Sequence, residues 1–388
     1  MRHKGELDSL QLYIHQKQPL EVIDLELWLK NRNGKTDILE DLFLNENYQD
    51  DDGNTILHIA ADKLDDDIVT AVLQLFQNDE ASLVKLLSVK NKRRETAPAL
   101  AARKSHTDIL RIMFGFLSVR QSEHFLLNTT TKGRTLLHTC AQTKKSEEIE
   151  FFSEHFAKSP DLWLKVLSAR DERKNTAVYY AAELGRTVNI MNMLETLTEP
   201  QVISLLSIGE NSTTALHAAA KKGKRGCITA MMSKVRSKHK KYKVMQLRDG
   251  TKETVLHKAA ERGDDECVDT IMKNVIPEKV FEYMSMESAT KSTALHLAVD
   301  RKKVETVKNL LERLKSSERS EFLKKTDDRG NTLNNLALRV NSQEIVMLLQ
   351  EYEEEQGNNL GTFVTSLNKS GLIQDGFEKH GMIKIVLL

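Results

Sequence analysis

Cysteine, proline, glycine and aromatic residues are all scarce in this chain of 388 residues. It has three cysteines, five prolines and 17 glycines, and aromatic residues make up 5% of the total. So little proline and glycine excludes collagen-like and low-complexity chains. Together with the few aromatics, it disfavours a β-sandwich or barrel and favours helix. The three thiols, Cys140, Cys227 and Cys267, are too few and too far apart for a disulfide framework and are typical of a reducing compartment.

Net charge and long apolar stretches are also lacking. The 57 basic residues nearly cancel the 56 acidic ones, which excludes a nucleic-acid binder that acts through its overall charge and a chain disordered by charge excess. No window of about 18 apolar residues occurs, so we expect no membrane span. The first residues, Met1–Glu6, lead into no apolar stretch, so we expect no secretory signal. The expected location is the cytoplasm, with the nucleus as the alternative.

A seven-residue string, T-x-L-H-x-A-A, recurs along the chain. The clear copies and the weaker copies together begin at Thr55, Thr96, Thr135, Thr176, Thr214, Thr254, Thr293 and Thr332. These eight threonines are 38 to 41 residues apart. A fixed period of this length is the signature of a repeat array, so we number the repeats 1 to 8 from these threonines.

Each repeat has the pattern of three short helices and a turn. The threonine suits a helix N-cap, because its hydroxyl can accept a backbone N–H of the first turn. Glycine follows nine residues later in three repeats, as expected where a helix ends. A second apolar helical pattern follows, and then a third element that begins with proline at Pro160, Pro200 and Pro277, which a first helical turn tolerates. Polar turns then lead to the next threonine.

On these residues the chain resembles the ankyrin-repeat family. The recurring T-x-L-H-x-A-A string, the glycine after the first helix and the D-x-x-G-x-T turn at Asp327 to Thr332 carry the resemblance. The usual ankyrin period is 33 residues, and the longer period here is similar to that of arrays in simple animals and intracellular bacteria. The cytoplasmic arrays of transient receptor potential channels are a weaker comparison. Three repeats depart from the motif, because Ala99, Tyr179 and Asn335 replace its histidine.

The resemblance implies an all-α ankyrin-repeat solenoid of about eight helix-pair units, with short extra helices and hairpin fingers. The expected domains are an N-terminal helical cap with a partial repeat at 1–49, the ankyrin-repeat domain at 50–352 and a C-terminal tail at 353–388.

Five of the eight repeats have a histidine at the same position, and such a series could suggest a metal site. These histidines are His58, His138, His217, His257 and His296. Packed helices lie about 8–10 Å apart, whereas zinc ligands converge within about 2 Å of the metal. We therefore predict that each histidine hydrogen-bonds the turn of its own repeat and its neighbour. The cysteines take small or apolar slots of the repeat and are predicted to be core residues.

No phosphate-binding, nucleophile-elbow or zinc-protease motif occurs. We therefore predict a protein that is not an enzyme and uses no metal, cofactor or small-molecule substrate.

Ten basic residues and no acidic residue occupy 221–243. One interpretation is a solvated helix end and loop. The others are a patch for an acidic partner, and a nuclear-import string at Lys238–Lys241. Nucleic acid is disfavoured, because Tyr242 is the only aromatic residue available for stacking.

The resemblance implies a protein scaffold or adaptor that binds its partner on the concave face, made of finger tips and the ends of the first helices. We expect a monomer. The alternatives are an ankyrin effector of an intracellular bacterium, or the ankyrin portion of a larger receptor or channel that continues beyond residues 357–388. The candidate partner-binding residues are Arg93, Arg94, Arg103, Lys104, Glu183, Lys221, Lys222, Lys238, Lys240, Lys241, Glu261, Arg262, Asp300 and Arg301.

Overall fold

The computed structural model describes residues 49–74, 76, 79–128 and 131–354. The chain divides into two compact units, one with residues 1–181 and 186–208, the other with residues 182–185 and 209–388. Repeats 1 to 4, apart from 182–185, belong to the first unit, and repeats 5 to 8 belong to the second. The predicted N-terminal cap lies outside the described residues except for its last residue, and so does nearly all of the predicted tail.

Every repeat begins with a helix directly after its threonine, so the predicted first helices are confirmed. These helices are α4 (Ile56–Lys63), α7 (Ala97–Lys104), α10 (Leu136–Cys140), α13 (Ala177–Leu184), α16 (Ala215–Lys221), α19 (Val255–Arg262), α22 (Ala294–Asp300) and α25 (Leu333–Arg339). The second helices are α5 (Asp66–Gln74), α8 (Thr107–Gly115), α11 (Glu147–His155), α14 (Thr187–Leu194), α17 (Arg225–Ser233), α20 (Asp265–Met272), α23 (Val304–Glu312) and α26 (Gln343–Glu354).

A third helix follows in seven repeats and accounts for the long period. These helices are α6 (Glu80–Leu87), α9 (Val119–Leu127), α12 (Pro160–Leu167), α15 (Glu199–Leu206), α18 (Lys238–Met245), α21 (Val280–Met284, preceded by the short helix η3 at Pro277–Lys279) and α24 (Ser316–Leu323). Proline occupies the first turn of three of these elements, as predicted. Among the described residues, strand occurs only in the finger before repeat 5, where β1 (Gly209–Glu210) pairs antiparallel with β2 (Thr213–Thr214). The all-α fold is confirmed.

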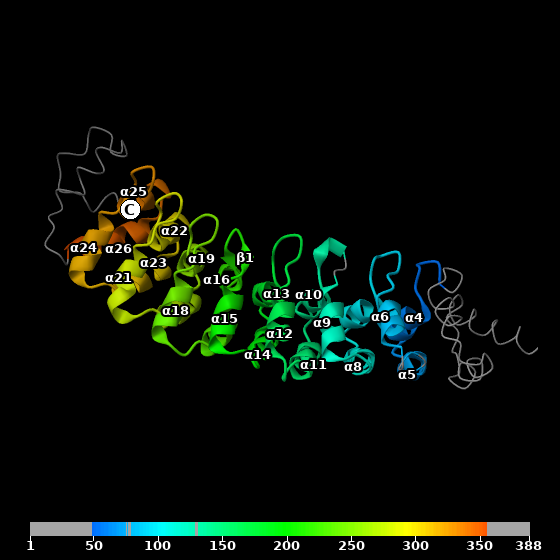
Figure 1. The fold of residues 1–388 in the computed structure, drawn as a ribbon. Coiled ribbons are helices and arrows are strands. Elements are labelled where there is room, and N and C mark those ends of the chain that lie inside the picture. Colours follow the sequence, from blue (N-terminus) through cyan, green and yellow to red (C-terminus); the bar gives the residue numbers. More distant parts are fainter. Residues whose placement is uncertain (1–48, 75, 77–78, 129–130, 355–388) are drawn as a thin grey trace, which may run out of the picture. The chain divides into compact units, whose positions relative to one another are not determined.

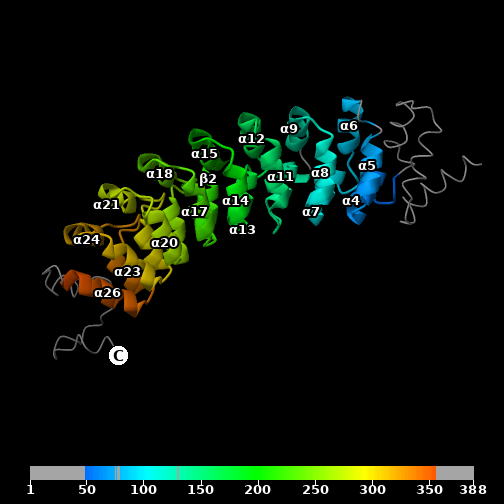
Figure 2. The ribbon, with the colours of Figure 1, turned by 90° about the horizontal axis from the view of Figure 1, so that it is seen from below.

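Equivalent helices pack on one another within each compact unit. In the second unit α16 packs on α19, α19 on α22 and α22 on α25 (Figure 1), while α17, α20, α23 and α26 form a second row (Figure 2). Figure 2 shows α18, α21 and α24 together along one edge of this unit. In repeats 1 to 6 the two small residues at the fifth and sixth positions after the threonine, such as Ala219 and Ala220, are fully buried. Their small side chains let neighbouring helices approach closely.

The recurring histidines hold consecutive repeats together. The Nδ1 atom of His257 accepts the backbone N–H of Thr254 at 3.1 Å and lies 2.9 Å from its hydroxyl. Its Nε2 atom must then carry the hydrogen, and it lies 3.2 Å from the Ser292 carbonyl of the next repeat. His58, His138 and His217 make the same bonds, with Nε2 to carbonyl distances of 3.0, 3.0 and 3.1 Å. Both ring nitrogens of these four histidines are thus used in hydrogen bonds, as the sequence predicted. His296 departs from the prediction, because its Nδ1 atom lies 2.8 Å from the Thr293 hydroxyl but its buried Nε2 atom has no hydrogen-bond partner among the described residues.

Repeats without this histidine use the threonine alone. The Thr96, Thr176 and Thr332 hydroxyls accept the backbone N–H three residues on, each at 3.3 Å. The helix still begins at the same position, because one N-cap bond is enough to start it. In repeat 2 the methyl group of Ala99 cannot form the side-chain bond that a histidine makes to the next repeat.

The fingers repeat an internal turn. In the fingers before repeats 1, 2, 6, 7 and 8 the side chain five residues before the threonine accepts backbone N–H groups two and four residues on, as Asp249 does from Thr251 at 2.9 Å and from Glu253 at 3.0 Å. Successive fingers also share a backbone bond, such as Ala289 N to Thr251 O at 2.8 Å and Asp328 N to Thr290 O at 3.0 Å. The fingers of one compact unit are therefore tied together and do not project as independent loops.

Candidate functional site

The predicted partner-binding residues of the first helices lie at the C-terminal ends of these helices. They occupy the seventh and eighth positions after each threonine, where the helix leaves the core. Arg103, Lys104, Lys221, Lys222, Arg262 and Arg301 are exposed, and Glu183, Glu261 and Asp300 are partly buried. The set therefore lies at the same place in each repeat, and we call these positions the first-helix surface of each compact unit.

Ion pairs run between neighbouring repeats along the first-helix surface. In the first compact unit Lys104 lies 2.8 Å from Asp62. In the second, Arg301 lies 2.8 Å from Glu261, and Lys222 lies 3.8 Å from Glu183. Exposed pairs of this kind contribute about 0.2–1 kcal/mol each. A charged side chain of a partner protein can therefore replace one member of such an ion pair at a small cost in free energy.

The charge of the first-helix surface differs from the near-neutral balance of the whole chain. In repeats 5 to 8 the seventh and eighth positions carry five basic and two acidic side chains. These are Lys221, Lys222, Arg262, Arg301 and Arg339, with Glu261 and Asp300. The surface is thus net positive by three charges, and Lys221 has no ion pair among the described residues.

Arg93 and Arg103 meet at a cavity in the first compact unit. This cavity of about 190 Å³ lies between the fingers and first helices of repeats 1 and 2, and Asp62 and Glu95 also line it. The Arg103 Nε atom lies 2.9 Å from a Glu95 carboxylate oxygen. Both signs of charge are therefore present where a partner side chain can enter.

Arg94 does not line this cavity. Its place in the finger is determined by the left-handed backbone conformation that the finger turn requires. It lies two residues before Thr96 with φ at 60°. Residues at the same place in other repeats share this left-handed conformation, namely Gly53, Gly133, Lys174, Ser212, Lys252, Lys291 and Gly330. The finger turn requires this backbone shape in all eight repeats. Arg94 is exposed and remains only a candidate contact.

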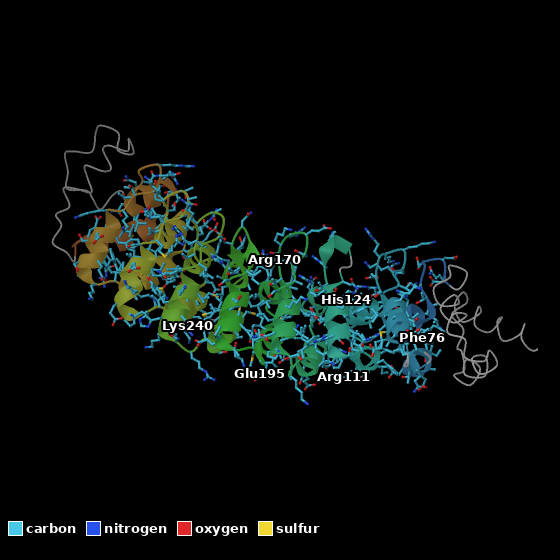
Figure 3. The ribbon with its side chains drawn as sticks, in the orientation of Figure 1. Phe76, Arg111, His124, Arg170, Glu195 and Lys240 are labelled. Carbon is cyan, nitrogen blue, oxygen red and sulfur yellow. The ribbon has the colours of Figure 1, made fainter. Side chains whose placement is uncertain are left out.

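The basic segment 221–243 does not form one patch, and it contains more than the helix end and loop of the first interpretation. Its residues are spread over the end of α16, over α17 and over α18. Lys238, Lys240 and Lys241 form the beginning of α18, and Figure 3 shows Lys240 on the side of its compact unit away from the finger loops. Lys221 and Lys222 therefore belong to the first-helix surface, whereas the lysines of α18 belong to a different face.

Sequence reasoning missed a buried ionic cluster in repeat 6. Lys258 is almost buried on α19 and contacts Asp249 at 2.8 Å and also Glu253. Burial opposes the ionisation of Asp249, but hydrogen bonds from Lys258 and Thr251 outweigh it and lower the pKa of Asp249 to about 2. The sequence does contain a sign of this cluster, because most repeats have an apolar residue at the fourth position after the threonine, where repeat 6 has Lys258. The cluster braces the finger against the helix.

The three cysteines are buried, as predicted, and form no disulfide with any described residue. Burial raises the pKa of Cys140 and raises that of Cys267 to about 12, so neither thiol is activated as a nucleophile. Within the described ranges, no group of three or more His, Cys, Asp or Glu side chains could hold a metal ion. None of the described helices is long and apolar enough to cross a membrane.

Comparison with known proteins agrees with this architecture. The family model for ankyrin repeats, which spans three copies, matches residues 256–360. Among solved structures, the chain is similar to the ankyrin repeat domain of Bcl-3, described as a unique member of the IkappaB protein family. That match has a TM-score of 0.50 and 17% identity, and covers 66% of this chain and 100% of the other. At this identity the likeness concerns the fold. No significant match was found among curated proteins.

Proposed function

This chain is an ankyrin-repeat protein, and we propose that it works as a scaffold or adaptor that binds another protein across its finger loops and first-helix surface. The ankyrin fold is typically a non-catalytic interaction module. The buried thiols of Cys140 and Cys267, whose pKa is raised, and the bridging histidines such as His257 fit a role in binding rather than catalysis.

The observation that carries the proposal is the contrast between buried and outward positions of the first helix. The fifth and sixth positions after each threonine are nearly always small and buried, whereas the seventh and eighth change in charge and size from repeat to repeat. Packing therefore determines the first pair and leaves the second pair free. A surface of variable side chains on a regular backbone suits recognition of an extended protein surface.

The charge of this surface favours an acidic partner. In repeats 5 to 8 it carries five basic and two acidic side chains. Complementary charge mainly speeds association and excludes wrong partners. The proposed partner is thus a protein with an acidic face, and its binding should weaken as salt rises.

The test uses the full chain as bait with a charge-reversed variant. Lys221→Glu combined with Lys222→Glu reverses the exposed end of α16. Lys243→Glu combined with Lys324→Glu is the matched control, because these exposed lysines lie on α18 and at the end of α24. Proteins captured from a lysate are compared by quantitative mass spectrometry, and far-UV circular dichroism checks that each variant folds.

We expect at least one protein to be retained by the wild type and the control but lost by the Lys221 and Lys222 variant. The loss should be largest at low salt, since exposed charges are screened beyond about 8 Å at physiological ionic strength. If all three baits retain the same proteins, or the wild type enriches none, the proposal is wrong.

A further inference from the structure

A second recess lies in the second compact unit, beside the start of α18 and apart from the first-helix surface. Its volume is about 390 Å³, within the range of about 300–1,000 Å³ that is usual for ligand pockets. Its basic lining comes from Lys238 and Lys241 of α18, from Lys273 at the end of α20, and from Arg313 at the end of α23. Side chains from three repeats therefore converge on one recess.

The positive charge of this recess is largely uncompensated. None of its lining residues carries a carboxylate. Lys238, Lys241 and Lys273 make no ion pair with any residue that the structure describes, whereas Arg313 is held 2.5 Å from Asp269. Three lysines thus face solvent together with one partly neutralised arginine.

The first turn of α18 departs from the usual charge preference of helices. Acidic side chains are favoured there, because the helix dipole places partial positive charge at the N-terminus. This turn instead contains Lys238, His239 and Lys240 and no acidic residue. A bound anion would relieve both the helix-terminal charge and the mutual repulsion of the lysines. Departures from a local rule of this kind are expected at functional sites.

The recess also has an apolar lining. Met272 and Val275 are buried, and Val280 of α21 is partly exposed. No aromatic side chain lines it, and proteins that hold single-stranded nucleic acid use aromatic side chains to stack the bases. Aliphatic walls with a basic rim suit a peptide that combines an aliphatic side chain with carboxylates.

We propose that this recess binds an acidic segment of a partner protein, with one aliphatic side chain against Met272, Val275 and Val280 and flanking carboxylates at Lys238, Lys241 and Lys273. The site is separate from the first-helix surface, so it adds a second contact to the proposed function. Either site can fail its test while the other passes.

The test is direct binding of a labelled pentapeptide, which has a central leucine with two glutamates on each side, to the full chain by fluorescence anisotropy. Two matched peptides replace the glutamates by glutamines, or the leucine by serine. The protein variant combines Lys238→Glu with Lys273→Glu. Its control is Lys243→Glu, an exposed lysine of the same helix that does not line the recess. A thymidine oligonucleotide of equal charge tests nucleic acid in place of the peptide.

We expect the acidic leucine peptide to bind the wild type, and the double reversal to weaken it about tenfold or more at low salt, because it acts on two charges at the rim. Lys243→Glu should change the affinity by less than about twofold, since a more distant exposed charge is screened. The serine peptide should bind more weakly and the glutamine peptide hardly at all.

The proposal is overturned if the acidic peptide does not bind the wild type, or if the double reversal and Lys243→Glu weaken it equally. Equal binding of the leucine and serine peptides would contradict the proposed contact between an aliphatic side chain and the apolar lining. Tighter binding of the oligonucleotide, lost in the same double variant, would assign the recess to nucleic acid.

Discussion

Mild acid should destabilise the second compact unit through its bridging histidines. Burial lowers the pKa of His217 and of His257 to about 4, from an ordinary value of 6.5. Both rings are therefore neutral in the folded protein when the unfolded chain begins to bind protons near pH 6.5. The stability that this difference provides is complete above that pH and is lost progressively as the pH falls towards 4.

The expected loss is large compared with the stability of a domain. Each unit of pKa difference corresponds to about 1.4 kcal/mol. At pH 5 each histidine should therefore cost about 2 kcal/mol, and the two together about 4 kcal/mol. Typical domains are stable by about 5–15 kcal/mol. Burial also lowers the pKa of His58, His138 and His296, so the other recurring histidines act in the same direction.

The assay is urea unfolding followed by far-UV circular dichroism from about pH 7.5 to pH 5. The informative variant combines His217→Asn with His257→Asn, because repeat 8 naturally has Asn335 in this slot and still forms its helix. The variant should be less stable than the wild type at neutral pH, since it loses the bonds to the Glu253 and Ser292 carbonyls. The difference should shrink by about 4 kcal/mol between neutral pH and pH 5.

His239→Asn is the control, because His239 is exposed on α18. It should leave the pH dependence of the wild type unchanged. The reasoning is refuted if the double asparagine variant loses stability on acidification as steeply as the wild type does.

Three further predictions concern single positions. Gly330→Ala should lower the free energy of unfolding by about 1 kcal/mol, because φ is 77° there and an added Cβ would meet no atom within 4 Å. Lys291→Gly, at the same finger position, should not destabilise, and urea titration of both variants checks the pair. Lys258→Leu should cost about 3 kcal/mol, because it leaves the buried Asp249 carboxylate without its cation; an unchanged melting temperature would contradict this. Glu148→Gln should stabilise by about 1 kcal/mol at neutral pH, because burial raises the pKa of the Glu148 carboxyl and so disfavours its charged form, and a lower melting temperature would count against it.

Much of the fold could be predicted because its information is local and repeated. Each sequence signal predicts the structure of a short stretch of backbone. These signals are the threonine at each helix start, the small residues that follow it and the prolines of the first helical turn. The Thr254 and His257 bond spans only three residues, so its spacing can be read from the chain. The left-handed positions were predicted only where glycine marks them. Lys302 and Asn341 adopt the same conformation nine residues after their threonines, because the turn between helices imposes it whatever the side chain.

The candidate sites could be predicted only in part. The outward positions of the first helices follow from the repeat pattern, so Arg301 and Glu261 were both singled out, but their mutual ion pair was not. Partners on this surface are about 40 residues apart in the chain, and their distance depends on how two repeats stack. For the same reason the basic run 221–243 looked like one patch and proved to be spread over three helices.

The linear chain alone specifies the period, the helix-forming segments and the residues that must be buried, because these depend on neighbours a few residues away and recur eight times. The tertiary structure decides which charges meet. It pairs Arg301 with Glu261 across a repeat boundary, and it brings Lys238, Lys273 and Arg313 from three successive repeats to one recess. The physical reason is that electrostatic and packing contacts depend on distance in space, and stacking places residues about one repeat apart in the chain side by side.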